Sequence, residues 1–337
     1  MSRPTLTVVI PAYNSREHIA ATLDALVESA TRGPFETDVV LVDDGSTDGT
    51  AEAVVAACAS RLPLRIVSQT NRGRFEARRT GLEAATGEWI LLLDSRVTLE
   101  EDALAFVATR LESGECVWNG HVHVRAGGNP YGTFWKLLAE LAWPAYFDEP
   151  RTTSYGPEDF DRFPKGTTCF LARRETLLSA VAEFRSGYSD SRRANDDTPL
   201  IRSIAMHERI HLSPRFACTY EPRGSGTAFI HHAVHRGIVF LDGHGRRESR
   251  YFPAVIAFYP VSTVLAVVAL RRPAIAIQVG AAIASAAALL GVVKRREPYE
   301  VVTLALLTPV YAAGHGIGMW CGLSLLAKNR LTDEPPA

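Results

Sequence analysis

The chain has 337 residues, and its 36 lysines and arginines nearly balance 37 aspartates and glutamates, which gives a formal net charge of -1 at pH 7. This balance does not favour nucleic-acid binding, and we expect no nucleic acid as a partner. The five cysteines are scattered and lack CxxC spacing, so the sequence implies neither a disulfide framework nor a structural zinc site.

Strand and helix patterns alternate through about residue 112. Short apolar runs rich in β-branched residues predict strands over 5–10, 37–42, 65–68 and 89–93. Helical patterns fill the intervals between these strands, with Asn14 as the expected cap of the first helix, and a helix over 99–112 follows the fourth strand. Such alternation is typical of a parallel sheet with right-handed crossovers, in which ligands bind at the carboxyl edge of the strands.

Polar motifs directly follow three of these strands. They are Pro11-Ala12-Tyr13 after the first strand, Asp43 and Asp44 after the second, and Asp94-Ser95-Arg96 after the fourth. Because the carboxyl ends of parallel strands meet at one edge of a sheet, we expect these motifs to lie together. The alternative for the acidic pair is a solvated turn without a ligand.

The pattern is less regular between residues 115 and 245. Residues 134–147 carry aromatic and aliphatic side chains at helical spacing, which fits either an interfacial amphipathic helix or an ordinary packed helix.

Residues 185–197 are polar and charged, which predicts a mobile segment, and a helix over 198–207 follows. His231 and His235 have metal-like spacing, but no HExxH motif or nearby carboxylate supports a zinc site.

Charged residues nearly vanish from three later stretches, 251–270, 274–293 and 301–327. Each is about long enough to cross a bilayer as a helix, so we predict a first domain over 1–245 and a membrane domain over 246–330. The basic residues that flank these spans favour a cytosolic location for the first domain. The short connection 271–273 fits either two full crossings or a re-entrant hairpin.

Glycines repeat every four residues in the last span, at Gly314, Gly318 and Gly322. This spacing lets two helices approach closely. The partner helix lies either in the same chain or in a second copy, and packing within the chain is the simpler interpretation.

Four motifs occur in order along the chain: VVIPAYN, VLVDDGSTDGT, Asn71-x-Gly73 and ARRTGLEAATGEWILLLDS. Together they resemble the inverting family 2 glycosyltransferases, and the resemblance extends from about Thr5 to His244. It implies an A-type glycosyltransferase fold, an α/β class in which a single Rossmann-like nucleotide-sugar-binding domain has a mixed sheet. About three transmembrane helices then follow. In this family the nucleotide lies across the carboxyl edge of the sheet, in agreement with the edge predicted above.

The resemblance gives the first two motifs a role in donor binding. Pro11-Ala12-Tyr13 matches the segment that frames the base and ribose, and Asp43 and Asp44 match the acidic pair that contacts the nucleoside. Carboxylates suit this role because they accept charge-assisted hydrogen bonds from a base N–H or from ribose hydroxyls. Arg78 matches a basic position after the Asn-x-Gly turn, and the alternative is a solvated helix arginine.

Asp94-Ser95-Arg96 matches only part of the family's Asp-x-Asp motif. The second carboxylate ordinarily helps to hold a divalent cation on the donor diphosphate, and arginine cannot ligate a metal. Either Asp94 still holds Mg2+ or Mn2+ through the diphosphate, or Arg96 replaces the cation in part. A third interpretation is that Arg96 points away and pairs with Glu100 or Glu101.

The stretch Asn195-Asp196-Asp197-Thr198 resembles the family's Glu-Asp motif, which precedes a helix and supplies the catalytic base. By this match Asp197 takes the proton of the acceptor hydroxyl, and a single in-line displacement inverts the anomeric centre. The alternative is that Asp196 and Asp197 are favourable charges at a helix N-terminus. Arg236 matches a segment near the diphosphate, and Gly166–Phe170 matches an acceptor-side turn.

We therefore predict a membrane-bound inverting glycosyltransferase that moves a sugar from a nucleotide-sugar donor to a hydroxyl acceptor, either lipid-linked or a cell-envelope glycan. Its expected partners include the lipid bilayer, and its expected location is the cell membrane, as a multi-pass protein with a cytosolic catalytic domain. One alternative is a polyprenyl-phosphate sugar synthase. Another, prompted by Arg96, is a catalytically silent membrane protein that binds sugar nucleotides.

Overall fold

A computed structural model describes residues 3–58, 61–247 and 249–332 of the chain. These residues form two compact units. The first comprises the residues up to Arg125 with Ala142–Arg185 and Asp196–Glu221, and the second comprises Ala126–Leu141, Ser186–Asn195 and the residues from Pro222 onward. The predicted domain boundary at residue 245 stays a prediction.

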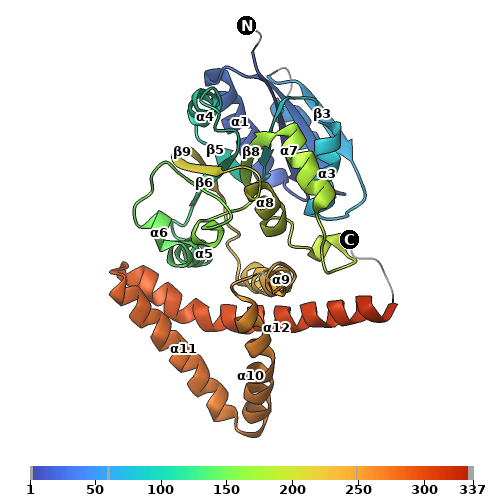
Figure 1. The fold of residues 1–337 in the computed structure, drawn as a ribbon. Helices are drawn as coiled ribbons and strands as arrows, with labels where there is room; N and C mark the ends of the chain where they lie inside the picture. The colour runs from blue at the N-terminus through green and yellow to red at the C-terminus, as the bar shows by residue number, and fades with distance from the viewer. Residues whose placement is uncertain (1–2, 59–60, 248, 333–337) are drawn as a thin grey trace. The chain divides into compact units, whose positions relative to one another are not determined.

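A mixed sheet forms the centre of the first unit (Figure 1). Its strands are β1 (Thr5–Ala12), β2 (Glu36–Asp43), β3 (Leu64–Ser68), β4 (Trp89–Leu93), β5 (Val97–Leu99), β6 (Trp118–Val124), β7 (Thr153–Tyr155), β8 (Cys169–Arg173) and β9 (Ile210–Tyr220). They run in the order β3-β2-β1-β4-β8-β6-β9-β5, and β7 pairs with β9. The pairs β1–β2, β2–β3 and β1–β4 are parallel, whereas β8 is antiparallel to β4. The predicted fold class, an α/β domain with a mixed sheet, is therefore confirmed.

Helices cover both faces of this sheet, which is why the central strands are apolar along their whole length. One face carries α1 (Arg16–Arg32), α2 (Thr50–Cys58) and α4 (Ala103–Leu111), and the other carries α3 (Arg74–Ala84), α7 (Arg174–Glu183) and α8 (Thr198–Ala205). Successive strand residues point to opposite faces, so Val8 and Ile10 are buried under α1 while Val9 is buried under α3. The short α6 (Pro144–Phe147) and η1 (Phe160–Arg162) lie in the later part of this unit.

Two predicted boundaries differ from the structure. β1 continues to Ala12, where the sequence predicts a turn from Pro11, because β2 pairs with it along its whole length. Pairing with β4 ends at Val9, so the sheet needs no N–H from Pro11 on that side. The helix predicted from Leu99 begins only at Ala103, because β5 first pairs with β9.

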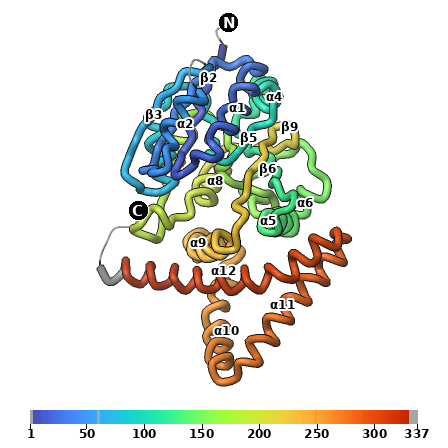
Figure 2. Tube along the Cα trace, turned by 180° about the vertical axis from the view of Figure 1, so that it is seen from behind, coloured from blue at the N-terminus to red at the C-terminus, as the bar shows by residue number. Residues whose placement is uncertain are grey.

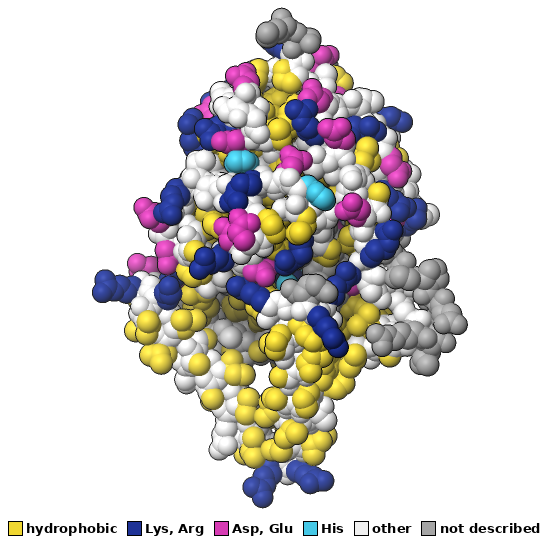
Figure 3. Space-filling model, viewed as in Figure 1, with side chains coloured by type: hydrophobic (Ala, Val, Ile, Leu, Met, Phe, Trp, Pro, Cys, Tyr) yellow, Lys and Arg dark blue, Asp and Glu magenta, His cyan; other side chains and the backbone are white. Residues whose placement is uncertain are grey.

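Helices form the second unit. They are α5 (Pro130–Ala142), α9 (Gly226–His244), α10 (Phe252–Arg271), α11 (Pro273–Val293), α12 (Pro298–Thr332) and the short η2 (Ser191–Arg193). Within the part of the chain that the structure describes, α10, α11 and α12 are long and apolar enough to cross a membrane, in agreement with the three predicted spans. Figure 3 shows hydrophobic side chains gathered over α10 and α11, with basic side chains where these two helices meet.

α12 packs against α9 (Figure 2), and closely approaching glycines form the interface. A Cβ added to Gly318 would lie 2.0 Å from the carbonyl oxygen of Val234, and one added to Gly237 would lie 2.0 Å from that of His315. The other two glycines of the repeat also lie against α9. The glycine repeat therefore serves helix packing within the chain.

Protein side chains cover the apolar face of α5. Phe134 and Leu137 are buried in a cluster with Phe229 of α9 and Leu304 of α12. On the polar side, Lys136 forms an ion pair with Glu300 at 2.8 Å. These contacts favour the packed-helix interpretation of this segment over the interfacial one.

Candidate active site

The first acidic pair lies at the end of β2, where the sequence places it. Asp43 is 9% exposed and Asp44 is 4% exposed. The Asp44 carboxylate accepts hydrogen bonds from three donors, the Arg72 N–H (2.8 Å), the Gln69 side-chain amide (2.7 Å) and the Gly73 N–H (2.9 Å). Asp44 therefore joins the end of β2 to the turn that precedes α3.

Glycines with left-handed backbone make this junction possible. Gly45 has φ +78° and Gly73 has φ +91°, conformations that other residues rarely adopt. A Cβ on Gly45 would also lie 3.0 Å from the backbone nitrogen of Asn71. The Asp-Asp-Gly and Asn-x-Gly motifs are thus parts of one folded structure.

The residues after β1 contact the loop that follows the acidic pair. The Asn14 N–H donates to Ser46 Oγ at 3.0 Å, and Asn14 Oδ1 accepts from the Thr47 N–H at 2.9 Å. Asn14 therefore does not cap α1 as the sequence predicts. Tyr13 is 51% exposed, whereas Pro11 is buried within β1. Tyr13 thus presents an aromatic ring to solvent at the end of β1.

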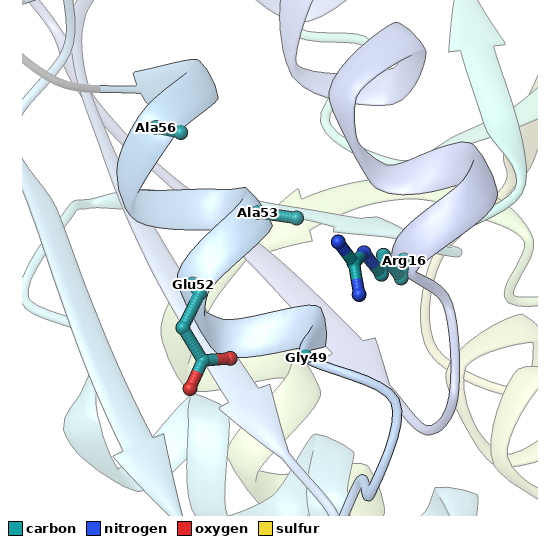
Figure 4. Close-up of a pocket in the computed structure, with 5 residues that line it drawn as sticks. All are labelled: Arg16, Gly49, Glu52, Ala53 and Ala56. Atoms are coloured by element: carbon teal, nitrogen blue, oxygen red, sulfur yellow. The ribbon is translucent and has the colours of Figure 1, made fainter.

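A pocket lies between α1 and α2 (Figure 4). Its lining residues are Arg16, Gly49, Glu52, Ala53 and Ala56. The Arg16 guanidinium points across it and donates to the carbonyl oxygen of Asp48 at 3.2 Å. None of the predicted site residues is among these lining residues, and the candidate site is built elsewhere on the sheet.

Arg78 lies at the centre of three carboxylates and is only 3% exposed. Its Nη2 donates to Asp94 Oδ1 at 2.8 Å. Its Nη1 donates to Asp196 and, at 3.3 Å, to Asp197 Oδ1. The solvated-arginine alternative therefore does not hold. Arg78 brings together the end of β4 and the start of α8, which are far apart in the sequence.

Asp197 is the more accessible member of the second acidic pair. Its side chain is 31% exposed, against 8% for Asp196. The Thr167 hydroxyl donates to the Asp197 oxygen that also accepts from Arg78, so two partners fix the orientation of this carboxylate. Asp197 is the N-cap residue of α8, and among the described residues its side chain makes no capping hydrogen bond to that helix.

Asp196 is the buried carboxylate of this cluster. Burial raises the pKa of Asp196 above its ordinary value, against the opposing charge of Arg74 and Arg78. Arg74 Nε lies 3.5 Å from Asp196 Oδ2. The sequence prediction missed Arg74. Its position one helical turn before Arg78, on the same face of α3, is the signal that could have identified it.

The residues after Asp94 are held by the backbone and by α1. Ser95 Oγ lies 2.7 Å from Ser15 Oγ, and the Arg96 carbonyl oxygen accepts from the Glu221 N–H at 3.0 Å. Glu100 and Glu101 are the two acidic residues considered as partners of Arg96, and Glu101 forms an ion pair with Arg32. Ser95 thus has a structural hydrogen bond at the entrance to α1.

Asp94 is the one carboxylate of the Asp94-Ser95-Arg96 motif that could ligate a divalent cation. Among the residues that the structure describes, no group of three His, Cys, Asp or Glu side chains is arranged to hold a metal. Mg2+ is commonly held by one or two carboxylates together with the phosphates of a substrate. Asp94 therefore fits a cation shared with a diphosphate, and does not fit a site made of protein ligands alone.

Arg236 belongs to α9 in the second unit. It is exposed, and its guanidinium carbon lies 5.9 Å from the centre of the Trp135 ring. The His232 ring lies 4.4 Å from the same tryptophan. The predicted contact of Arg236 with a diphosphate stays a prediction, as does the role of Gly166–Phe170 as an acceptor-side turn.

Residues 7–177, just over half of the chain, match the family model described as Glycosyl transferase family 2. The chain is 37% identical over 110 residues to the succinoglycan biosynthesis protein ExoO of Rhizobium meliloti (strain 1021), a region that is 33% of this chain and 30% of that protein. It is 38% identical over 103 residues to the amylovoran biosynthesis glycosyltransferase AmsB of Erwinia amylovora, covering 30% and 33%. A PGL/p-HBAD biosynthesis glycosyltransferase of Mycobacterium bovis (strain BCG / Pasteur 1173P2) is 37% identical over 111 residues, covering 32% and 42%. The chain spans less than half the length of each of these relatives.

Two solved structures share the fold. The mannosyltransferase PcManGT from Pyrobaculum calidifontis, in complex with GDP-Man and Mn2+, aligns with a TM-score of 0.53 and 22% identity over 99% of this chain and 89% of that one. S. aureus TarS 1-349 in complex with UDP aligns with a TM-score of 0.51 and 17% identity over 97% and 92%. In both cases the similarity is one of fold.

Proposed function

The chain belongs to glycosyl transferase family 2, and from that premise we propose that it is a membrane-bound inverting enzyme that uses a nucleotide-activated sugar. It has the A-type glycosyltransferase fold, and its described residues include three long apolar helices. The observation that carries the proposal is the cluster in which Arg78 binds Asp94, Asp196 and Asp197, because a donor-side carboxylate and a candidate base then share one site.

The strand ends of β1 and β2 are proposed to bind the donor nucleoside. A carboxylate offers about four lone-pair positions. Asp44 uses three of them for hydrogen bonds within the chain, and Asp43 accepts one from the Ser46 N–H at 3.0 Å. Both carboxylates therefore keep the capacity to accept from a base N–H or a ribose hydroxyl. Pro11, Ala12 and the exposed Tyr13 would frame the same nucleoside.

Asp197 is proposed as the catalytic base. Its carboxylate accepts the proton of the acceptor hydroxyl as the hydroxyl oxygen forms a bond to the anomeric carbon. The bond from that carbon to the diphosphate breaks in the same step, and the nucleoside diphosphate leaves with the bonding electrons. Because attack and departure take place on opposite faces, the anomeric configuration inverts. Thr167 and Arg78 orient the base for this step.

Asp94 is proposed to hold Mg2+ or Mn2+ together with the donor diphosphate, while Ser95 supports the turn. The cation would supply positive charge against the leaving diphosphate. The alternative is that Arg96 provides that charge through its guanidinium. Arg236 is proposed as a further diphosphate contact.

The membrane helices support a location in the cell membrane, as a multi-pass protein with a cytosolic catalytic domain. Such a location favours an acceptor that is lipid-linked or a cell-envelope glycan, because the active site then works near the lipid headgroups. Relatives named for the biosynthesis of succinoglycan and amylovoran are in keeping with a glycan product. A lipid phosphate as the acceptor would instead make the protein a polyprenyl-phosphate sugar synthase.

A thermal-shift screen of nucleotide sugars on the detergent-solubilised full chain tests this proposal. A donor at about 100 times its Kd should stabilise the fold by about 2.7 kcal/mol. The stabilising donor is then offered to lipid-linked saccharides, polyprenyl phosphate and water-soluble saccharides, with Mn2+ or with excess chelator. Failure of every donor to bind or to be transferred would refute the proposal. Full activity in chelator would favour Arg96 over a cation at Asp94.

A further inference from the structure

The first turns of α12 are bound to α5. The Lys136 side chain donates to Glu300 at 2.8 Å, and the hydroxyls of Thr133 and Tyr299 lie 3.3 Å apart. Leu304 is buried in the cluster that also contains the apolar side chains of α5. Polar and apolar contacts together therefore fix the start of α12 beside α5.

The last turns of α12 are bound to the polar segment Ser186–Asn195. The Asn329 side chain donates to the carbonyl oxygen of Gly187 at 3.1 Å and accepts from the Ser189 hydroxyl at 3.0 Å. Asp242 of α9 accepts from the Gly187 N–H at 2.7 Å, so the same segment is also bound to α9. The end of α12 thus lies beside residues that precede the three long apolar helices in the chain.

The partners of α12 lie on one side of any membrane that the chain enters. In the described part of the chain, the first helix long and apolar enough to cross a bilayer begins at Phe252. Among those residues, no such helix separates α5, Ser186–Asn195 and α9 from one another. A polar or irregular segment does not cross the hydrocarbon region, so these three elements share one side.

The length of α12 excludes a crossing that keeps the contacts at both of its ends. At about 1.5 Å per residue, Glu300 and Asn329 lie about 44 Å apart along the helix. The hydrocarbon core is about 30 Å thick, so a crossing α12 would carry one of them to the far side, away from its partners. Between these ends, Gly314, Gly318 and Gly322 pack against α9, which holds the middle of α12 to the same side.

A single face of α12 is left both apolar and exposed. Its large side chains are 39% to 67% exposed and include Val302, Leu306, Val310, Ile317 and Trp320. At about 3.6 residues per turn, these positions fall within about 80° of one another around the helix axis. The glycines that pack against α9 lie outside this stripe. An exposed apolar stripe on a surface helix fits the lipid interface, where tryptophan is also enriched.

We propose that α12 lies along the membrane surface and does not cross it, with this stripe in the lipid and both ends on the side of the residues that precede α10. The inference rests on the proposed membrane location. It places the basic residues that flank α12 on the cytosolic side, as the positive-inside rule favours. These residues are Lys294, Arg295, Arg296, Lys328 and Arg330. α10 and α11 are then the helices that enter the bilayer, and α12 runs across the direction of α10 (Figure 1).

Reporters fused to the C-terminus of the full chain test this inference. Green fluorescent protein becomes fluorescent when it stays in the cytosol of a bacterial host, and alkaline phosphatase becomes active only when it is exported. We expect the first fusion to be fluorescent and the second to be inactive. This expectation holds whether α10 and α11 cross fully or form a re-entrant hairpin, because both arrangements return the chain to the cytosolic side before α12.

A matched control adds an unrelated apolar helix of about 20 residues between α12 and each reporter. This helix should export the reporter, so the fluorescence should be lost and the phosphatase activity gained. A short epitope at the C-terminus gives a second measurement without a fused domain. An antibody should bind this epitope in permeabilised spheroplasts and not in intact ones.

An active phosphatase fusion, or antibody binding to the epitope in intact spheroplasts, would overturn the inference. Either result in a membrane-bound chain refutes only the position of α12. A chain recovered in the soluble fraction would instead refute the proposed membrane location on which the inference rests. Sugar transfer by the untagged chain tests the proposed reaction separately.

Discussion

The pairs Asp43–Asp44 and Asp196–Asp197 both lie in the first unit, and each precedes a helix, but different donors hold them. Neutral groups hold the first pair, namely backbone N–H groups and the Gln69 side chain. The second pair is bound by a buried guanidinium, that of Arg78. Neutral donors fix a carboxylate and leave its charge in place, whereas an arginine also compensates that charge.

This difference separates the roles of the two pairs. The first pair is held by neutral donors and keeps the capacity to accept hydrogen bonds from a nucleoside. In the second pair Arg78 compensates the buried Asp196, and the more exposed Asp197 lies next to that compensated charge. We therefore expect changes in the first pair to affect donor binding and the turns nearby, and changes in the second pair to affect turnover.

The largest effect should come from Asp197→Asn. An amide cannot take the acceptor proton, so we expect kcat to fall by roughly 100- to 10,000-fold with donor binding retained. Steady-state transfer assays and donor thermal shifts measure the two quantities. Asp43→Asn is the contrasting variant, in which the donor KM should change more than kcat. Near-normal turnover of Asp197→Asn would remove this residue as the base.

Arg78→Met should have the next largest effect. It leaves the buried Asp196 without its closest positive partner, and breaking a buried ion pair in this way costs about 3–5 kcal/mol. For a unit of this size, the thermal midpoint of the detergent-solubilised chain should fall by roughly 10 °C. Arg78→Lys keeps the charge and should lose less. A midpoint unchanged in Arg78→Met would contradict the central role of this arginine.

Asp44→Asn should destabilise the fold by less. An amide has one acceptor oxygen and adds two donors, so the Arg72 and Gly73 N–H groups can no longer both be satisfied. The expected loss is about 1–3 kcal/mol, measured by urea unfolding. Asp43→Asn, which faces the single Ser46 N–H, is the matched control and should lose less. Equal losses would mean that the turn does not depend on Asp44.

The smallest effect is a dependence of stability on pH. Because the pKa of Asp196 is raised in the fold, the folded chain binds this proton more tightly than the unfolded chain does. The stability from this group is therefore present below its ordinary value, about 3.9, and is lost as the pH rises through the raised pKa. Thermal midpoints recorded from pH 4 upward should fall in the wild type relative to Asp196→Asn. The opposite slope would contradict the burial of this carboxylate.

The sequence by itself determined the alternation of strands and helices, the position of Asp43 and Asp44 at a strand end, and three stretches long enough to cross a membrane. Each of these follows from a short window. A strand covered on both faces must be apolar throughout, a left-handed turn needs glycine, and a membrane span needs about 20 apolar residues. Such rules act between near neighbours in the chain, so a pattern of residue types is enough to reveal them.

Only the tertiary structure decided which side chains meet. Nothing in the neighbourhood of Arg78 shows that it binds carboxylates from β4 and α8, or that Thr167 holds Asp197. Likewise, the composition of residues 185–197 predicts mobility, and only the structure shows that Asp242 of α9, far along the chain, accepts hydrogen bonds from both ends of Ser186–Asn195. Hydrogen bonds and ion pairs between distant segments depend on distances of a few tenths of an ångström, which are set by the packing of the whole unit and not by local sequence.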